Sequence, residues 1–455
     1  MYLVLPNLAF ILIGRAFFIN RALVNSDYLF LWISSSYLSR RTTSVLYLFL
    51  IVLDMILSTE SIYHFSTAEL LVMAGEILKF YPITFYLVAG ALFLLAIAVF
   101  AVTRERGVVR QLLSKRSQLV IGTVALVLSA ATVIRSSDAF DRYLDTFGAS
   151  EIVASGVIET GLATYRVVMA SQHSQDTMPV QKGATAGMKR DLSLQGEAAQ
   201  PYDIVIILVE SQGLLKSARD MNRVLAPLID PAIQARYAIN TGNVRFFGAT
   251  MFGELRTLCR IYVPQAVPQD LPRLDQCWPN VLGRHGYETV SYHGFGKWFY
   301  ERYLWYPQVG FQRSYFAEEL KPLSPPMCGI KSHGVCDLWI AGQVENELLM
   351  PERKTKKFIY WLTLNSHLPV DADLAGESSF DCASTATLQV EIAPCNLARI
   401  HHQLYARIAQ IALNRGIPPT RFIIVGDHMP PFTTLSERAL YDETRVPFVE
   451  LVPRQ

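Results

Sequence analysis

The chain has 455 residues, a formal net charge of +2 and 51% hydrophobic residues. A charge this close to zero gives no electrostatic basis for binding nucleic acid, and the apolar content is too high for an ordinary soluble protein of this size. The apolar excess lies almost wholly before residue 136. The composition therefore predicts a transmembrane region over residues 1–136, followed by a globular domain.

Four apolar segments in this region are candidate transmembrane helices: about Tyr2–Phe18, Ser44–Leu57, Pro82–Val102 and Gln118–Ile134. Arg15 interrupts the first, and the second reaches a spanning length only if it continues beyond Leu57. Arginine and lysine gather in the loop between the first two segments and in the loop between the last two, whereas the middle loop is acidic. By the positive-inside rule the basic loops are cytoplasmic, so everything after the fourth segment is outside.

Residues 137–200 are expected to form juxtamembrane helices and a linker, and residues 201–455 an extracytoplasmic domain. All six cysteines lie in this domain, and none has the CxxC spacing of a zinc ribbon. An even set of this kind favours disulfides in an oxidising compartment, with buried free thiols as the alternative. Among the fifteen possible connectivities we expect the nearest neighbours in sequence to pair, Cys259 with Cys277, Cys328 with Cys336 and Cys382 with Cys395.

Three short apolar runs have the composition of buried parallel strands, and each leads to a potential metal ligand. Tyr202–Ser211 contains Glu210, Phe358–His367 ends in His367, and Arg421–His428 ends in Asp427 and His428. Ligands of an open α/β sheet bind beyond the carboxyl ends of its strands, so these side chains are expected to form a divalent-metal site. For Asp427 and His428 alone, a turn with a capping Asp and a surface His is the alternative.

Further elements alternate in the pattern of an α/β domain with a mostly parallel sheet. Gly286–Gly294 reads as a strand that ends beside His293, and Ala398–Arg415 as an amphipathic helix. Phe247–Leu258 begins with a glycine turn and continues as a helix with Thr250 at its N-terminus, where a phosphate is favoured. A hydroxyl beside a divalent metal is a competent nucleophile, although Thr250 could instead merely cap the helix.

Five motifs follow one another in the order typical of one protein group. They are Glu210, a Gly-x-Thr-x-x-x-Glu segment at 248–254, His293-Gly294, Ser366-His367 and Gly426-Asp427-His428. Together they resemble the lipoteichoic acid synthases and the lipid A phosphoethanolamine transferases, which are membrane-bound, sulfatase-like members of the alkaline phosphatase superfamily. The resemblance implies a sulfatase-like α/β domain with a mostly parallel sheet over residues 201–455, behind a multi-span α-helical anchor.

The resemblance also implies roles for individual residues. Glu210, Thr250, Asp427 and His428 would hold one divalent ion, Mn2+ or Zn2+, with Thr250 as the nucleophile. His367 would contact the transferred phosphate or the leaving group. By their spacing, His293, Tyr300 and Arg302 match the glycerol-phosphate pocket of the synthases, with core packing as the alternative for Tyr300.

The implied activity is transfer of a phospholipid head-group phosphate, from phosphatidylglycerol or phosphatidylethanolamine, through a phospho-threonine intermediate to an envelope glycan or lipid. The alternative is a phosphodiesterase, phosphatase or sulfatase-like hydrolase of the same superfamily. A true sulfatase is disfavoured, because Thr250–Gly253 does not match the Cys/Ser-x-Pro-x-Arg segment that such enzymes modify, and a non-catalytic envelope domain would lack the metal ligands. The cysteines and the anchor together indicate an inner-membrane protein with a periplasmic catalytic domain.

Overall fold

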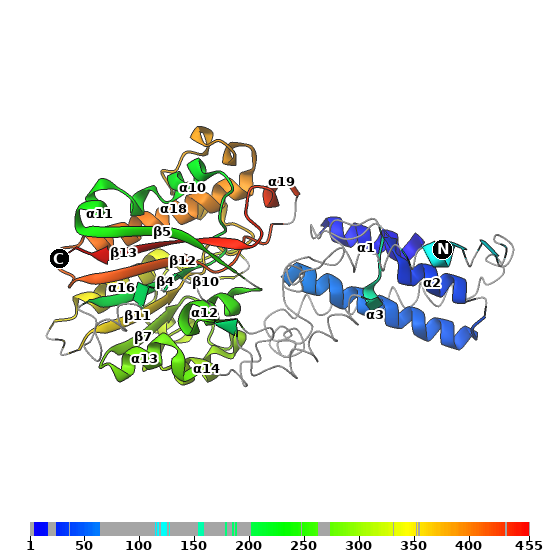
Figure 1. Ribbon diagram of the computed structural model, residues 1–455, viewed down its shortest axis with the longest axis horizontal. Helices are drawn as coiled ribbons and strands as arrows, with labels where there is room; N and C mark the ends of the chain where they lie inside the picture. Colours follow the sequence, from blue (N-terminus) through cyan, green and yellow to red (C-terminus); the bar gives the residue numbers. More distant parts are fainter. Residues whose placement is uncertain are drawn as a thin grey trace. The chain divides into compact units, whose positions relative to one another are not determined.

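The computed structural model describes residues 4–16, 24–35 and 37–63, short stretches between 114 and 188, and residues 202–454. Within the last range, 247, 263–273, 331, 352, 354 and 433–434 are not described. The chain divides into two compact units, Met1–Ser174 and Gln175–Gln455, and each is treated by itself below (Figure 1).

The described residues of the first unit include three helices and one short parallel strand pair. The helices are α1 (Val4–Ala16), α2 (Ser26–Ser34) and α3 (Arg40–Tyr63), and the strands are β1 (Val24–Asn25) and β2 (Val153–Ala154). In the part of this unit that the structure describes, no helix combines the length and the apolar character needed to cross a membrane. The expected span Pro82–Val102, most of Gln118–Ile134 and most of the linker lie outside the described residues, so the four-span anchor stays a prediction.

The second unit is built on a seven-stranded sheet whose main strands are parallel. Strands β12, β4, β11, β7 and β8 run parallel, and β13 is antiparallel to both of its neighbours, β12 and β5. Every residue of β4, β11 and β12 is buried, which explains their uninterrupted apolar sequences. The predicted mostly parallel sheet is confirmed. In spatial order the strands are β5 (Tyr237–Arg245), β13 (Arg445–Pro453), β12 (Thr420–Gly426), β4 (Asp203–Val209), β11 (Lys357–Leu362), β7 (Glu288–His293) and β8 (Arg313–Tyr315).

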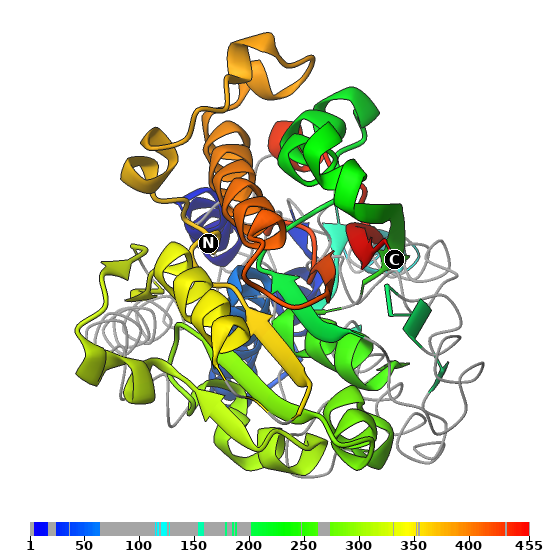
Figure 2. The ribbon, with the colours of Figure 1, turned by 90° about the vertical axis from the view of Figure 1, so that its left-hand side faces the viewer.

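Helices cover both faces of this sheet. On one face, Val205 and Trp361 of the sheet share a core with Ile340 of α16 and Ile408 of α18, the yellow and orange helices of Figure 2. On the other face, Tyr360 of β11 meets the ring of Tyr306 on α14. The helices are α10 (Ala218–Val224), α11 (Pro231–Arg236), α12 (Thr250–Cys259), α13 (Trp278–Arg284), α14 (Arg302–Val309), α15 (Ala317–Leu320), α16 (Asp337–Leu349), α17 (Ala372–Gly376), α18 (Ile392–Leu413) and α19 (Leu435–Arg438).

Short elements complete the unit. Two small antiparallel pairs join β3 (Met178–Pro179) to β6 (Ile261–Tyr262) and β9 (Met327–Cys328) to β10 (Gly334–Val335). Single 3-10 turns occur at Ala226–Leu228, Leu274–Gln276, Phe299–Glu301, Lys321–Leu323, Cys382–Ser384 and Leu388–Val390.

Two predicted boundaries were wrong. The strand expected to end in His367 stops at Leu362, and the chain turns before it reaches the histidine. The helix expected from Ala398 begins earlier, at Ile392, and ends at Leu413. Pro394 lies in its first turn, where a missing N–H costs no helical hydrogen bond, so the proline does not delay the start of the helix.

The cysteine prediction is confirmed in full. The structure contains the disulfides Cys259–Cys277, Cys328–Cys336 and Cys382–Cys395, which account for all six cysteines. The alternative of buried free thiols is therefore wrong.

Candidate metal centre and nucleophile

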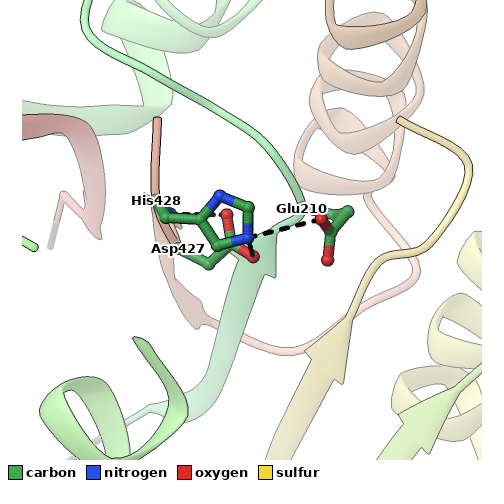
Figure 3. A group of neighbouring side chains, drawn as sticks. All are labelled: Glu210, Asp427 and His428. Carbon is green, nitrogen blue, oxygen red and sulfur yellow. Dashed lines mark hydrogen bonds and ion pairs between the residues drawn. The ribbon is translucent and has the colours of Figure 1, made fainter. Parts of the chain in front are cut away.

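Two adjacent parallel strands bring the candidate ligands together. Gly426 of β12 pairs with Val209 of β4, so the two strands end level and their next residues, Asp427 and Glu210, emerge side by side. His428 follows directly. One donor atom from each of these three side chains lies within 4.8 Å of the donor atoms of the other two (Figure 3).

Thr250 completes the group from the start of α12. Its hydroxyl donates a hydrogen bond to Glu210 Oε2 at 3.2 Å and lies 3.4 Å from His428 Nε2. The residue that caps the helix is Ala249, with extended backbone angles, and Thr250 is the first helical residue. The alternative role for Thr250 as a simple cap is therefore wrong, and its hydroxyl points to the other candidate ligands instead.

The Asp427 carboxylate is fully buried and only half satisfied. Its Oδ1 accepts hydrogen bonds from the backbone N–H groups of Ser211 at 2.8 Å and His428 at 2.6 Å. Its Oδ2 has no hydrogen-bond partner among the described residues. A buried polar atom rarely lacks a partner in a folded protein, and a bound cation would satisfy this oxygen. The alternative of a surface turn with a capping Asp is wrong.

The imidazole of His428 faces the two carboxylates of the cluster, whose pKa values are both shifted. His428 Nδ1 lies 2.8 Å from the Met429 carbonyl oxygen and donates to it, so the other ring nitrogen, Nε2, faces Asp427 Oδ2 at 3.2 Å and Glu210 Oε1 at 3.6 Å. Burial and the charge of Glu210 raise the pKa of the Asp427 carboxyl well above its usual range. Burial also opposes ionisation of Glu210, but His428 and His367 outweigh it and lower the pKa of that carboxyl. Two carboxylates and one imidazole fit a divalent cation.

A second layer of contacts fixes the ligands. The Glu210 carbonyl accepts hydrogen bonds from Ser366 Oγ at 2.6 Å and His401 Nε2 at 3.1 Å. Arg256, buried on α12, donates to the carbonyl oxygen of Asp427 at 3.1 Å and to that of Gly426. Such contacts orient metal ligands. The sequence did not indicate Arg256 or His401, because each reaches the site only through the packing of its helix on the sheet.

The histidine expected to contact the leaving group lies at the same edge of the sheet. His367 is exposed, in the turn after β11, and its Nδ1 donates to the Leu368 carbonyl oxygen at 2.8 Å. Its charge influences Glu210. The structure thus brings His367 to the site without a direct hydrogen bond to the ligands in the described contacts.

The three residues predicted to bind the head group lie together, but they are buried. His293 ends β7 and donates from Nδ1 to the Leu362 carbonyl oxygen at 3.1 Å; burial and the nearby Arg302 hold its pKa well below the usual range, so it is neutral. The Tyr300 side chain is 5% exposed and has a left-handed backbone with φ 55. Its ring lies 5.1 Å from the Arg302 guanidinium.

Arg302 is engaged in an ion pair that the sequence did not reveal. Its Nη2 lies 3.0 Å from Glu254 Oε2, and the exposed fractions of the two side chains are 1% and 0%. Tyr306 also donates to Glu254. Glu254 is the acidic residue of the Gly-x-Thr-x-x-x-Glu segment, so the motif contained the partner but gave no sign of the pairing. The predicted contact of Arg302 with a phosphate stays a prediction.

Comparison with known proteins finds one family whose sequence profile matches this part of the chain. Residues 231–455 match the sequence profile of the family described as Sulfatase. This match covers just under half of the chain. The match includes Thr250, Asp427 and His428, whereas Glu210 lies before it. The resemblance expected from the order of the motifs is confirmed at this level.

No curated protein matches the chain by sequence. Solved structures similar to it include the lipoteichoic acid synthase LtaP of Listeria monocytogenes, at 15% identity and a TM-score of 0.41, over 59% of this chain and 72% of that one. The Streptococcus pyogenes phosphoglycerol transferase GacH, in complex with sn-glycerol-1-phosphate, gives 15% and 0.39, over 60% and 78%. The periplasmic domain of Escherichia coli EptC, in complex with Zn, gives 14% and 0.38, over 57% and 75%.

Proposed function

We propose that this protein is a metal-dependent phosphotransferase. It takes the head-group phosphate of a phospholipid, as phosphoglycerol or phosphoethanolamine, and passes it through phospho-Thr250 to a hydroxyl of an envelope glycan or lipid. The observation that carries the proposal is the Thr250 hydroxyl, which does not cap its helix and lies between Glu210 and His428 beside the unpartnered oxygen of Asp427.

Glu210, Thr250, Asp427 and His428 would hold one divalent ion, Mn2+ or Zn2+. When bound, the ion makes the threonine hydroxyl more acidic and offsets the negative charge of the phosphate. The donor set of oxygen and imidazole ligands suits either metal.

The protein groups account for the protons of both steps. In the first step the Thr250 oxygen bonds to phosphorus while its proton passes to Glu210 Oε2, the acceptor at 3.2 Å. The bond between phosphorus and the diacylglycerol oxygen breaks, and protonated His367 gives that oxygen its proton. In the second step an acceptor hydroxyl bonds to phosphorus and loses its proton to His367. The bond between phosphorus and Thr250 then breaks, and the threonine oxygen recovers its proton from Glu210.

His293, Tyr300 and Arg302 would recognise the head group. The neutral His293 uses Nδ1 as a donor, so its Nε2 is an acceptor that suits a hydroxyl or an ammonium group. Tyr300 would form the wall of this pocket, with Arg302 behind its ring.

The site would work outside the inner membrane, as a periplasmic domain held close to its lipid donor by the apolar N-terminal region. The three disulfides support an oxidising compartment. The positive-inside pattern of the loops supports the same orientation.

The full-length protein in detergent, with Mn2+ or Zn2+, tests the proposal when it is incubated with phosphatidylglycerol or with phosphatidylethanolamine. Diacylglycerol release and the intact mass of the protein are recorded for the wild type, for Thr250→Ala and for Thr250→Ser. We expect a head-group phosphate adduct on the wild type, none on the alanine variant and a recovered adduct on the serine variant. If neither lipid gives an adduct or diacylglycerol, the lipid-donor proposal fails. Rapid release of the adduct to water would instead favour a hydrolase.

A further inference from the structure

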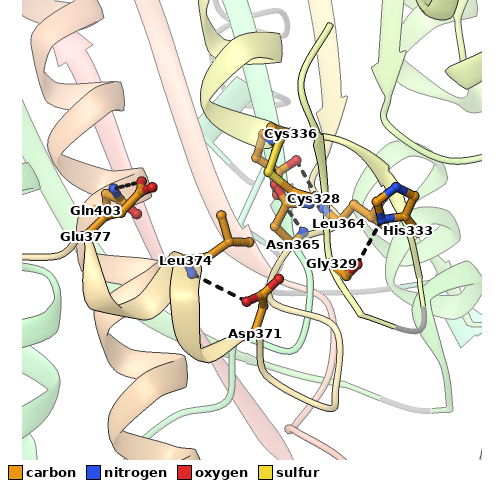
Figure 4. Close-up of a disulfide and its surroundings, with 11 residues drawn as sticks. Cys328, Gly329, His333, Cys336, Leu364, Asn365, Asp371, Leu374, Glu377 and Gln403 are labelled. Carbon is orange, nitrogen blue, oxygen red and sulfur yellow. Dashed lines mark hydrogen bonds between the residues drawn. A yellow bond between two sulfur atoms is a disulfide. The ribbon is translucent and has the colours of Figure 1, made fainter.

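A hairpin closed by a disulfide packs between the two segments that carry His293 and His367. Strands β9 and β10 form it, and the Cys328–Cys336 disulfide closes it (Figure 4). The Val335 N–H donates to the carbonyl oxygen of Gly294, the residue after His293, at 2.9 Å. A Cβ on Gly334 would lie 2.4 Å from that same oxygen and 2.4 Å from Leu364 Cδ2, so only glycine allows this close approach.

Asp337 extends the hairpin into the turn that carries His367. Its carboxylate accepts hydrogen bonds from the backbone N–H groups of Leu364 at 2.9 Å and Asn365 at 2.7 Å. In return, Asn365 Oδ1 accepts the N–H of Asp337 at 2.6 Å. These paired contacts are buried and fix two consecutive peptide groups just before Ser366, which itself bonds to the Glu210 carbonyl oxygen. The turn is thus held at both Asp337 and Glu210.

The carboxylate of Asp337 does not serve the N-terminus of its own helix. Asp337 is the first residue of α16, where an acidic side chain usually serves the N-terminus of its own helix. Here both of its carboxylate oxygens accept from the turn after β11 instead. We propose that Asp337 is a positioning residue for the phosphotransfer reaction: it fixes the 364–367 turn, and thereby places His367 for proton transfer to the leaving oxygen. This inference rests on the proposed function and adds a residue to it.

The leaving group provides the first test. Diacylglycerol leaves as an alkoxide and needs a proton, whereas 4-nitrophenolate leaves without one. In Asp337→Asn the amide turns an N–H toward a backbone N–H, and the turn loses an acceptor. In a two-step reaction kcat/KM for the donor reports the first step alone, in which His367 protonates the leaving oxygen. We expect kcat/KM for lipid cleavage by the full-length protein to fall about tenfold or more, and kcat/KM for bis(4-nitrophenyl) phosphate to change less than about twofold. In a His367→Ala background, Asp337→Asn should cost nothing further, because the two residues act as one unit.

Asp220→Asn is the matched control. Asp220 is also buried, and its carboxylate accepts the N–H groups of Ala386 and Thr387, both at 2.8 Å, but it serves a segment with no candidate site residue. We expect Asp220→Asn to lower both activities by the same factor, because it acts only by reducing the fraction of folded protein. Equal loss on both substrates in Asp337→Asn, or an undiminished further loss in the His367→Ala background, would show that Asp337 only maintains the fold.

Hydrogen exchange makes the test independent of turnover. In Asp337→Asn the amides of 364–367 should exchange at least about tenfold faster, while those of β4 and β12 keep their protection. Unchanged exchange at 364–367 would overturn the proposal even if the wild type cleaves neither substrate. If the wild type cleaves neither substrate but the amides of 364–367 exchange faster in Asp337→Asn, Asp337 does fix the turn, and the proposed phosphotransfer is rejected.

Discussion

Replacing Asp427 by Asn should stabilise the protein without metal and destabilise it, relative to the wild type, with metal. The carboxylate oxygens of Asp427 and Glu210 lie within 4.8 Å of each other. At an effective dielectric constant of about 20, two unit charges at that separation repel by roughly 3.5 kcal/mol. Asparagine keeps the oxygen that accepts from Ser211 and His428, and it places an N–H where Oδ2 now meets His428 and Glu210.

Metal reverses the order because only the wild type has the full set of ligands. In EDTA at pH 8, where ionisation of Asp427 is most costly, we expect the variant to unfold about 6–12 °C above the wild type, from roughly 3 kcal/mol. At a metal concentration of about a thousand times the dissociation constant, the wild type gains roughly 4 kcal/mol and the variant little. Tryptophan fluorescence follows the transition, because Trp32 is the only tryptophan outside the second unit.

The control and the refuting results are both well defined. Asp220→Asn breaks a satisfied buried clamp and should lower the midpoint by a similar amount with and without metal. If Asp427→Asn also lowers the unfolding midpoint in EDTA, the Asp427 carboxylate acts as a structural hydrogen-bond acceptor, and its repulsion with Glu210 does not destabilise the protein. If neither Mn2+ nor Zn2+ raises the midpoint of the wild type, the metal centre itself is rejected.

Three further perturbations test other parts of the structure. Arg302→Met should cost about 3–5 kcal/mol of stability because Glu254 is left buried and uncompensated, and adding Glu254→Gln should restore much of it in urea unfolding. Replacing Cys259 and Cys277 by Ala opens a loop with a sequence separation of 18 and should cost about 3 kcal/mol, read as a lower urea midpoint than for the wild type. Burial raises the pKa of Asp337 to about 7 from an ordinary value of 3.8. The folded state therefore binds this proton more tightly, and the stabilisation, roughly 4 kcal/mol, is complete below about pH 4 and lost as the pH rises through 7. Asp337→Asn should flatten that part of the stability profile, and an unchanged slope would contradict this assignment.

The sequence predicted the centre of the sheet because burial on both faces leaves a signature that needs no tertiary information. Strands β4, β11 and β12 are apolar at nearly every position, and residues that end such strands gather at one edge. Edge strand β5 gave no such signal. Most of its residues are exposed, its sequence is largely polar, and it joins the sheet only through the antiparallel strand β13.

In the candidate site, too, some features could be predicted from the sequence and others could not. Glu210, Thr250, Asp427 and His428 could be predicted because each stands at the end or start of an element whose position the fold fixes. Contacts that depend on side chains meeting across elements could not. The hydrogen bonds of the Asp337 carboxylate to the 364–365 peptide groups join the start of a helix to a turn about 27 residues later. No local sequence pattern marks either the helix start or the turn as a partner of the other.

Under the proposed function, the choice of head group must depend on residues other than the metal ligands. The ligands and Thr250 meet only the phosphate, which phosphoglycerol and phosphoethanolamine share. Beyond it, His293 is neutral and the charge of Arg302 is matched by Glu254, so the pocket wall presents almost no net charge. A wall of this kind neither repels an ammonium group nor attracts it strongly. The choice between the two head groups would then depend on the hydrogen bonds that each can make, with His293 Nε2 as the candidate acceptor.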